Sequence, residues 1–97
     1  MSVLADISLF PLDKGASVSP YVTRAVRLIR DSGLPFVLGP MGTCVEGELE
    51  DILALVRDCH AVLAQDCERV YLTVKLDSRR GPTGRLAAKV AAVRDKL

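Results

Sequence analysis

The sequence predicts an α+β domain in which an antiparallel four-stranded sheet packs against two helices, with an extra helix at the C-terminus. Three observations lead to this fold class. Residues 3–10 and 70–77 alternate between two kinds of side chain, as strands do. Residues 20–32 and the segment that begins at residue 48 place apolar side chains at the 3.6-residue period of a helix. Between those two segments, two short β-prone runs flank a turn of glycine and proline.

The first predicted strand has one clearly apolar face. That face carries Val3, Ala5, Ile7 and Leu9. Pro11 ends the strand. The first helix is predicted over Pro20–Ser32, because Ser19 can cap the free amides and proline has no amide to lose at the first position. Gly33 provides a left-handed residue that stops the helix.

The middle of the chain predicts a hairpin and a second helix. The runs Phe36–Leu38 and Thr43–Glu46 are joined by a short turn, which is typical of paired strands. From Glu48 the period becomes helical, and acidic residues in the first turn suit the positive end of the helix dipole. The predicted buried stripe of this helix consists of Leu49, Ile52, Leu53, Val56, Cys59 and Leu63.

The last third of the chain predicts a strand, a loop and a helix. Residues Val70–Asp77 alternate most clearly in the chain. Residues 78–83 contain adjacent arginines, glycine and proline and are predicted to form a loop. Apolar residues then recur at helical spacing among alanines, which predicts a helix over Gly84–Lys96.

This order of elements has a well-defined topology. Two right-handed β-α-β units that share a hairpin place the strands in the order 4-1-3-2, with both internal helices on one face. That arrangement is a ferredoxin-like sandwich. Its other face carries Leu4, Phe10 and Tyr71 among polar residues, so the last helix, a second copy of the chain, or both must cover it.

The composition indicates one globular domain over residues 1–97. The chain is 49% hydrophobic and 26% charged, with a net charge of +1. That charge provides no field to hold nucleic acid or an anionic membrane. Neither a membrane span nor a signal peptide is visible, so we expect a cytoplasmic protein. A mean hydropathy of +0.27 is high for so small a monomer and predicts a homodimer or homotetramer.

The cysteines do not indicate a disulfide or a metal site. Cys44, Cys59 and Cys67 are odd in number and lack CxxC spacing. His60 is the single histidine, and adjacent residues on a helix point in different directions. We therefore expect reduced thiols, no metal and no cofactor.

Four motifs resemble those of the thiamine-binding-protein-like family of small ferredoxin-fold proteins, long described as a domain of unknown function. They are Ser17–Val22, Gly39–Thr43, Glu46–Glu48, and Arg69–Val70 leading to Asp77–Arg80. The resemblance implies that the chain binds thiamine or its hydroxymethylpyrimidine moiety, has no catalytic activity, and forms dimers and tetramers by packing sheets across subunits.

In the predicted topology, the end of the first strand, the start of the first helix and the hairpin lie at one end of the sheet. The candidate ligand-binding residues there are Phe10, Ser17, Ser19, Met41, Gly42 and Thr43. The hydroxyls would make polar contacts, Phe10 and Met41 an apolar wall, and Gly42 a close backbone approach. Each has a structural alternative: Ser19 as a helix cap, Gly42 as a turn residue, and Met41 as a core residue.

Glu46 is a seventh candidate, as the carboxylate that would face the thiazolium of thiamine. It is expected to gather at the opposite end of the sheet with Glu48, Asp77, Arg79 and Arg80. There, a polar network within or between subunits is the alternative interpretation.

The function predicted from these observations is non-catalytic binding of thiamine or its pyrimidine near the hairpin and a subunit interface. The alternative is an oligomeric assembly or regulatory subunit that responds to a small anion such as sulfate or phosphate. An enzyme is disfavoured, because the sequence offers neither a nucleophile paired with a base nor a glycine-rich phosphate loop.

Overall fold

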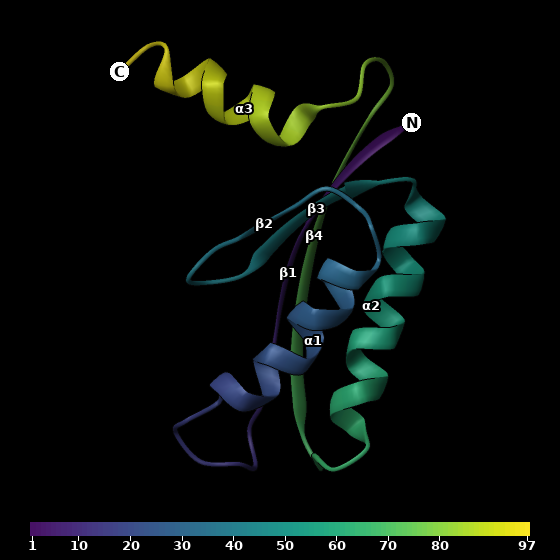
Figure 1. The fold of residues 1–97 in the computed structure, drawn as a ribbon, viewed down its shortest axis with the longest axis vertical. Helices are drawn as coiled ribbons and strands as arrows, with labels where there is room; N and C mark the ends of the chain where they lie inside the picture. The colour runs from purple at the N-terminus through teal and green to yellow at the C-terminus, as the bar shows by residue number, and fades with distance from the viewer.

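The computed structural model describes residues 1–97 and contains four strands and three helices (Figure 1). The elements, in chain order, are β1 (Ser2–Pro11), α1 (Ser19–Asp31), β2 (Phe36–Leu38), β3 (Thr43–Gly47), α2 (Leu49–Ala64), β4 (Val70–Arg79) and α3 (Arg85–Arg94). None of the three helices is long and apolar enough to cross a bilayer.

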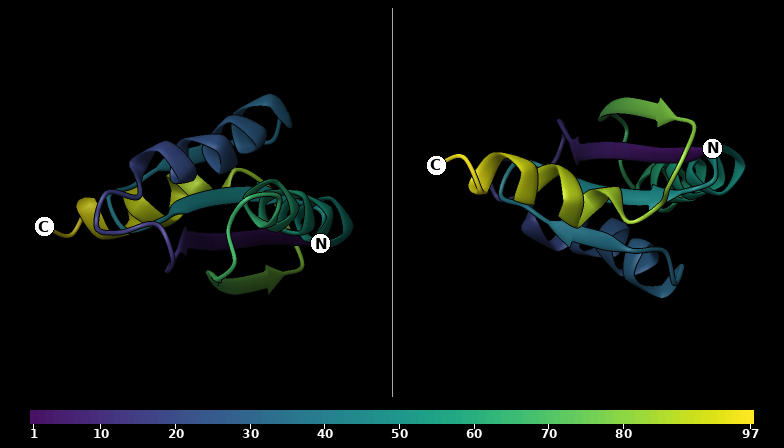
Figure 2. Two further views of the ribbon diagram at one scale, coloured as in Figure 1. Left: turned by 90° about the horizontal axis from the view of Figure 1, so that it is seen from below. Right: turned by 90° about the horizontal axis from the view of Figure 1, so that it is seen from above.

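The strands form one antiparallel sheet in the order β2-β3-β1-β4. This is the predicted order 4-1-3-2 read from the other edge, so the ferredoxin-like fold is confirmed. Helices α1 and α2 pack against each other and against β1 on one face, while α3 crosses one end of the sheet (Figures 1 and 2).

The two neighbours of the central strand β1 differ in length. β4 pairs with all of β1, from Ser2 opposite Arg79 to Pro11 opposite Val70. β3 pairs only with residues 3–7 of β1, and its first residue, Thr43, lies opposite Ile7. The last four residues of β1 therefore extend beyond the end of β3. This overhang shapes the site described below.

The core lies between the sheet and the two internal helices. Its most buried members are Val3, Ala5, Ile7 and Leu9 of β1, Ala25 and Ile29 of α1, Val45 of β3, and Ile52, Leu55, Cys59 and Leu63 of α2. The apolar face predicted for β1 is thus confirmed.

The predicted stripe of α2 is wrong at two positions. Leu49 and Leu53 are 43% and 49% exposed, whereas Leu55, which the prediction omitted, is buried. Successive residues of a helix are about 100° apart, so Leu53 lies a quarter-turn away from Ile52. Leu55 follows Ile52 by three residues and continues the face that packs against α1.

The helix ends also differ slightly from their predicted places. The Val18 carbonyl accepts hydrogen bonds from the amides of Tyr21 and Val22, both at 3.0 Å. Helix α1 consequently begins at Ser19, Val18 is its cap, and no side-chain cap is formed. The predicted capping role of Ser19 is wrong, because Ser19 already lies within the first turn. Gly33 has φ +79° and stops the helix as predicted.

The sheet face opposite α1 and α2 is only partly covered. At the end where β1 begins, Leu86 and Val90 of α3 line a pocket together with Leu4 of β1. At the other end, Phe10 stacks on Tyr71 with ring centroids 5.7 Å apart. Tyr71 remains 55% exposed, so α3 covers one end of this open face and leaves the aromatic pair uncovered.

Candidate functional site

A cavity of about 210 Å³ lies between α1, the second half of β1 and the turn that joins β2 to β3. It occupies the place that a longer β3 would fill, because β1 continues past Thr43 while β3 does not. Val22 and Val26 of α1 form its wall on the helix side. The cavity is therefore a direct result of the unequal strand lengths.

The turn at the mouth of the cavity depends on two glycines. The Gly39 amide donates to the Gly42 carbonyl at 2.8 Å and closes the turn. A Cβ on Gly39 would lie 2.9 Å from that same carbonyl oxygen. A Cβ on Gly42 would lie 3.0 Å from Asp6 Oδ1 and 3.1 Å from the Ile7 carbonyl oxygen on β1. A side chain at Gly39 would therefore distort the turn, and one at Gly42 would push the hairpin away from β1.

Thr43 provides the most distinctive polar group of the cavity. The residue is 4% exposed, yet its hydroxyl makes none of the side-chain hydrogen bonds of the chain. Only one fully buried side-chain polar atom of the chain lacks a hydrogen bond, and it is Arg85 Nε. The unpaired Thr43 hydroxyl is therefore not fully buried, and it is reachable from the cavity that Thr43 lines. Since buried polar groups are usually paired, this hydroxyl is available to a ligand.

Leu9 adds a backbone donor and acceptor to the same wall. The Leu12 amide donates to the Arg69 carbonyl, toward the side of β4. Bonding direction alternates along an antiparallel strand, so the N–H and C=O of Leu9 point to the opposite side. There β3 has already ended. Both groups of Leu9, a cavity-lining residue, are therefore left without a strand partner.

The structure brings four of the seven candidate residues to this cavity. Phe10, Met41, Gly42 and Thr43 line it. Met41 is 86% exposed at the mouth, so the alternative of a core residue is wrong. The Phe10 ring itself stacks on Tyr71 on the open sheet face.

The two serines lie outside the cavity. Ser17 is exposed in the loop before α1. Ser19 is exposed and lines a separate groove between α1 and β2.

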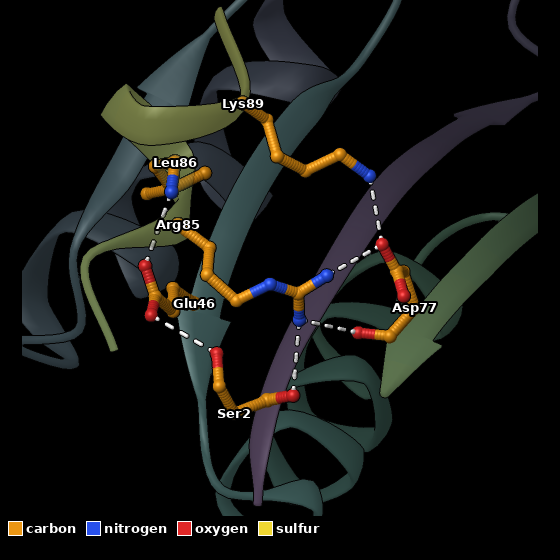
Figure 3. A network of polar contacts seen from close by, with 6 residues as sticks. All are labelled: Ser2, Glu46, Asp77, Arg85, Leu86 and Lys89. Atoms are coloured by element: carbon orange, nitrogen blue, oxygen red, sulfur yellow. Dashed lines mark hydrogen bonds and ion pairs between the residues drawn. The ribbon is translucent and has the colours of Figure 1, made fainter. Parts of the chain in front are cut away.

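Glu46 lies at the other end of the sheet, where it holds the start of α3 (Figure 3). Its carboxylate accepts hydrogen bonds from the Ser2 hydroxyl at 3.1 Å, the Gly84 amide at 2.8 Å and the Leu86 amide at 3.2 Å. The residue is 5% exposed. This is the intramolecular network that the sequence offered as the alternative for Glu46, and it leaves the residue remote from the cavity.

Arg85 continues this network beside Glu46 (Figure 3). Its guanidinium donates to the Ser2 carbonyl at 3.2 Å, to the Asp77 carbonyl at 3.2 Å and to the Asp77 carboxylate at 2.6 Å. Lys89 also donates to the Asp77 carboxylate, at 2.7 Å. Helix α3 is thus attached to β1, β3 and β4 mainly through polar groups.

The network shifts the acidity of both carboxyl groups. Burial alone would raise the pKa of Glu46, but the hydrogen bonds from Leu86, Gly84 and Ser2 outweigh it and leave the pKa below its ordinary value. The hydrogen bond from Lys89, followed by the charge of Arg85, likewise lowers the pKa of Asp77. Both groups are therefore ionised when they hold α3.

Sequence reasoning missed Arg85 and favoured Arg79 and Arg80, which are exposed and form no ion pair. A usable signal was present: a cation at the positive end of a helix is unfavourable unless a carboxylate accompanies it. It also missed Leu9, whose contribution is made by backbone atoms and so has no signature in the side chains.

The cysteines and histidine do not assemble into a metal centre. No group of three or more His, Cys, Asp or Glu side chains is close enough to hold a metal ion. Burial raises the pKa of the Cys59 thiol to about 11, and its Sγ lies 3.6 Å from the Ala25 carbonyl oxygen. Cys59 is thus a packed core residue with little thiolate at neutral pH.

The amino-acid sequence of this chain is similar to that of several known proteins. The family model described as thiamine-binding protein matches residues 5–94. UPF0045 protein MJ1052 of Methanocaldococcus jannaschii is 35% identical over 94% of this chain and 91% of its own length. UPF0045 protein Mb1933 of Mycobacterium bovis is 39% identical over 96% of this chain and 92% of its own. These descriptions refer to thiamine binding or to unknown function, not to a known class of enzyme.

Solved structures agree with the fold. The crystal structure of MJ1052 superposes with a TM-score of 0.89 at 34% identity and covers 97% of both chains. A Thermotoga maritima protein, described as a "putative thiamine biosynthesis/salvage protein", superposes with a TM-score of 0.80 at 26% identity, covering 93% of this chain and 98% of its own.

Proposed function

The chain belongs to the thiamine-binding protein family, and on this basis we propose that its cavity binds the aminopyrimidine ring of thiamine or of hydroxymethylpyrimidine. The observation that carries the proposal is the Thr43 hydroxyl, which is buried, faces an apolar cavity and has no partner in the protein. The resemblance seen in the sequence and the family match both favour this ligand class.

The size of the cavity supports a single ring. Sites for drug-sized ligands enclose about 300–1,000 Å³, and an apolar cavity of about 150 Å³ is enough for benzene. A volume of about 210 Å³ therefore suits one substituted six-membered ring. The thiazolium half of thiamine would lie outside the cavity, past the exposed Met41.

The polar groups of the cavity also match an aminopyrimidine. The edge of this ring presents a ring nitrogen that accepts a hydrogen bond and an amino group that donates one. The free N–H and C=O of Leu9 offer the complementary donor and acceptor, and the Thr43 hydroxyl can serve a second ring nitrogen. Val22, Val26 and Ile7 provide the apolar faces.

Binding without catalysis is favoured by the same lining. None of the residues that line the cavity has a titratable side chain. General acid–base catalysis requires such a group within hydrogen-bond reach of the reacting atoms. The proposed role is therefore that of a binding protein.

We also propose that the chain self-associates through its open sheet face. The stacked pair of Phe10 and Tyr71 lies uncovered on that face. Val90 and Val93 of α3, at the other end of the sheet, are also 48% and 60% exposed. A second copy of the chain would remove these apolar side chains from water.

The test of ligand binding is calorimetric titration of the parent and of Thr43→Val with thiamine and with hydroxymethylpyrimidine. Valine keeps the β-branched shape but removes the hydroxyl, so the ligand is left with one unpaired polar group. We expect the variant to lose about 1–3 kcal/mol of binding free energy, which corresponds to a roughly five- to 150-fold weaker affinity. Thr73→Val, on the open face of β4, is the matched control and should bind like the parent.

Two outcomes would contradict this proposal. Equal affinity of Thr43→Val and the parent would remove the ligand from this cavity. Absence of binding of both compounds by the parent at millimolar concentration would reject the ligand class, and the anion-responsive assembly subunit would then be the better interpretation.

A further inference from the structure

A second groove adjoins the cavity on its outer side, between α1 and the edge strand β2. It encloses about 580 Å³. Val22, Val26 and Leu38 line both the cavity and the groove. A ligand whose ring fills the cavity can therefore extend along α1 into the groove without crossing another element.

The groove is positively charged. Arg27 and Arg30 line it, and no aspartate or glutamate does. The two arginines are three residues apart, so they lie on the same side of α1. The groove at the far end of the sheet has acidic residues instead, namely Glu46, Glu48 and Asp51. The positive charge is thus a local feature of a chain whose net charge is only +1.

Both guanidinium groups are free to bind an anion. Arg27 takes part in no ion pair and no side-chain hydrogen bond. Arg30 uses only its Nε, which donates to the adjacent Asp31 at 2.9 Å, and both of these side chains are more than 60% exposed. Arg24 is different, because two hydrogen bonds of 2.7 and 2.9 Å tie it to Asp66.

From these features we propose that the groove binds the phosphate group of a phosphorylated ligand, so that the preferred ligand is a thiamine phosphate ester. This inference rests on the proposed function, which places the pyrimidine in the cavity. Guanidinium groups bind phosphate oxygens through paired, charge-assisted hydrogen bonds.

The placement of the arginines on α1 fits such a ligand. Each directly follows a residue that lines the cavity, and both line the adjoining groove. Thiamine carries its pyrimidine at one end and its phosphorylated oxygen at the other. Phe36 also lines the groove, and its ring can face the cationic thiazolium.

Charge discriminates between the esters and free thiamine. The thiazolium is permanently positive, so the two guanidinium groups that line the groove repel unphosphorylated thiamine. A phosphate group adds a charge of roughly −1.5 to −2 at neutral pH, which reverses the interaction. The same arginines therefore oppose the vitamin and attract its phosphate esters.

The test measures binding of thiamine, thiamine monophosphate, thiamine diphosphate and inorganic phosphate to four proteins by calorimetry. These are the parent, Arg27→Gln, the double variant Arg27→Gln/Arg30→Gln, and Arg57→Gln. Arg57 is the matched control, because it is exposed on α2 and pairs with the adjacent Asp58 as Arg30 pairs with Asp31.

We expect the parent to bind the monophosphate roughly ten- to 100-fold more tightly than thiamine. The double variant should lose most of this ratio by weaker binding of the esters, while its affinity for thiamine stays the same or rises. Arg57→Gln should keep the parent's ratio. The preference for the esters should shrink as salt is added.

Each contrary result has its own meaning. If thiamine binds and the monophosphate binds no more tightly, the phosphate site is refuted and the pyrimidine cavity stands. Loss of thiamine and ester affinity alike in the double variant also refutes the phosphate site. Inorganic phosphate that binds as tightly as the ester shows a site for a free anion and overturns the ester proposal. If the parent binds no thiamine compound, the proposed function fails and this inference fails with it.

Discussion

Gly42 belongs to the turn of the β2–β3 hairpin and lies close against the backbone of β1. An added Cβ would meet the Ile7 carbonyl oxygen at 3.1 Å, and this atom belongs to the backbone of the central strand. A flexible side chain could move aside, but a paired backbone cannot. The need for glycine here is steric and does not depend on a ligand.

We expect Gly42→Ala to lower the free energy of unfolding by about 1–3 kcal/mol, because the hairpin must shift to relieve the contact. Urea unfolding followed by circular dichroism measures the change. Met41→Ala is the control, since Met41 is 86% exposed and surface substitutions usually stay within about 0.5 kcal/mol. Equal midpoints for the two variants would show that the hairpin adapts freely.

The sequence could predict where in the fold the candidate site lies, but it could not predict which backbone groups would be free to bind a ligand there. Strand ends and turns have clear signatures, so six candidates were expected together at one end of the sheet. Four of them, Phe10, Met41, Gly42 and Thr43, line the cavity there, and the two serines do not. The free backbone groups of Leu9 depend on where β3 stops relative to β1. That register is set by tertiary pairing, which side-chain patterns do not record.

Among the elements, α3 is held differently from α1 and α2. Its anchor is the Glu46 carboxylate, which accepts three hydrogen bonds from Ser2, Gly84 and Leu86. The helix itself is largely exposed. Attachment of α3 should therefore depend on the ionisation of Glu46 and Asp77 more than on apolar packing.

This attachment predicts a loss of stability in acid. The folded-state pKa values of Glu46 and Asp77 lie below their ordinary values of 4.5 and 3.8. Such groups stabilise the fold above their ordinary pKa, and the contribution disappears as the pH falls through the lowered values. We expect the free energy of unfolding to decline from about pH 5 downward.

Glu46→Gln identifies the source of that decline. The glutamine side chain would present an NH₂ group to backbone amides that are themselves donors. We therefore expect the free energy of unfolding to fall by about 1–3 kcal/mol at pH 7. The difference in the free energy of unfolding between Glu46→Gln and the parent should become smaller as the pH approaches 3. Glu50→Gln, an exposed carboxylate without a hydrogen bond, is the control. A constant difference across this range would mean that Glu46 contributes by shape and not by charge.

At the level of elements, the sequence predicted all seven in order, with errors at the ends and on one helix face. The error on α2 has a physical cause. Apolar residues occur almost all round this helix, so Leu53 and Leu55 fit the periodicity about equally well. Contact with α1 decides between them. The network at α3 joins β1 and β3 to the much later β4 and α3, and no local pattern predicts it.

For the whole molecule, the uncovered part of the open face predicts association. We expect light scattering at micromolar concentration to give a dimer or tetramer mass. Tyr71→Glu places a charge beside Phe10 on this face and should produce monomers. Leu53→Glu is the matched control, because Leu53 is similarly exposed but lies on the helix layer.

Either of two results would change this interpretation. A parent of monomer mass would reject self-association. An unchanged mass in Tyr71→Glu would move the interface away from the aromatic pair, and the exposed apolar residues of α3 would become the next surface to test.

The full-length pairing of β1 with β4 has a consequence for folding during translation. β1 leaves the ribosome well before β4, yet Ser2 pairs with Arg79 and Pro11 with Val70. The centre of the sheet thus cannot close until both helices and β4 have been synthesised. Topologies with such distant pairings fold slowly. During translation, the edge of β1 that pairs with β4 stays unpaired on the nascent chain and remains open to aggregation until β4 emerges.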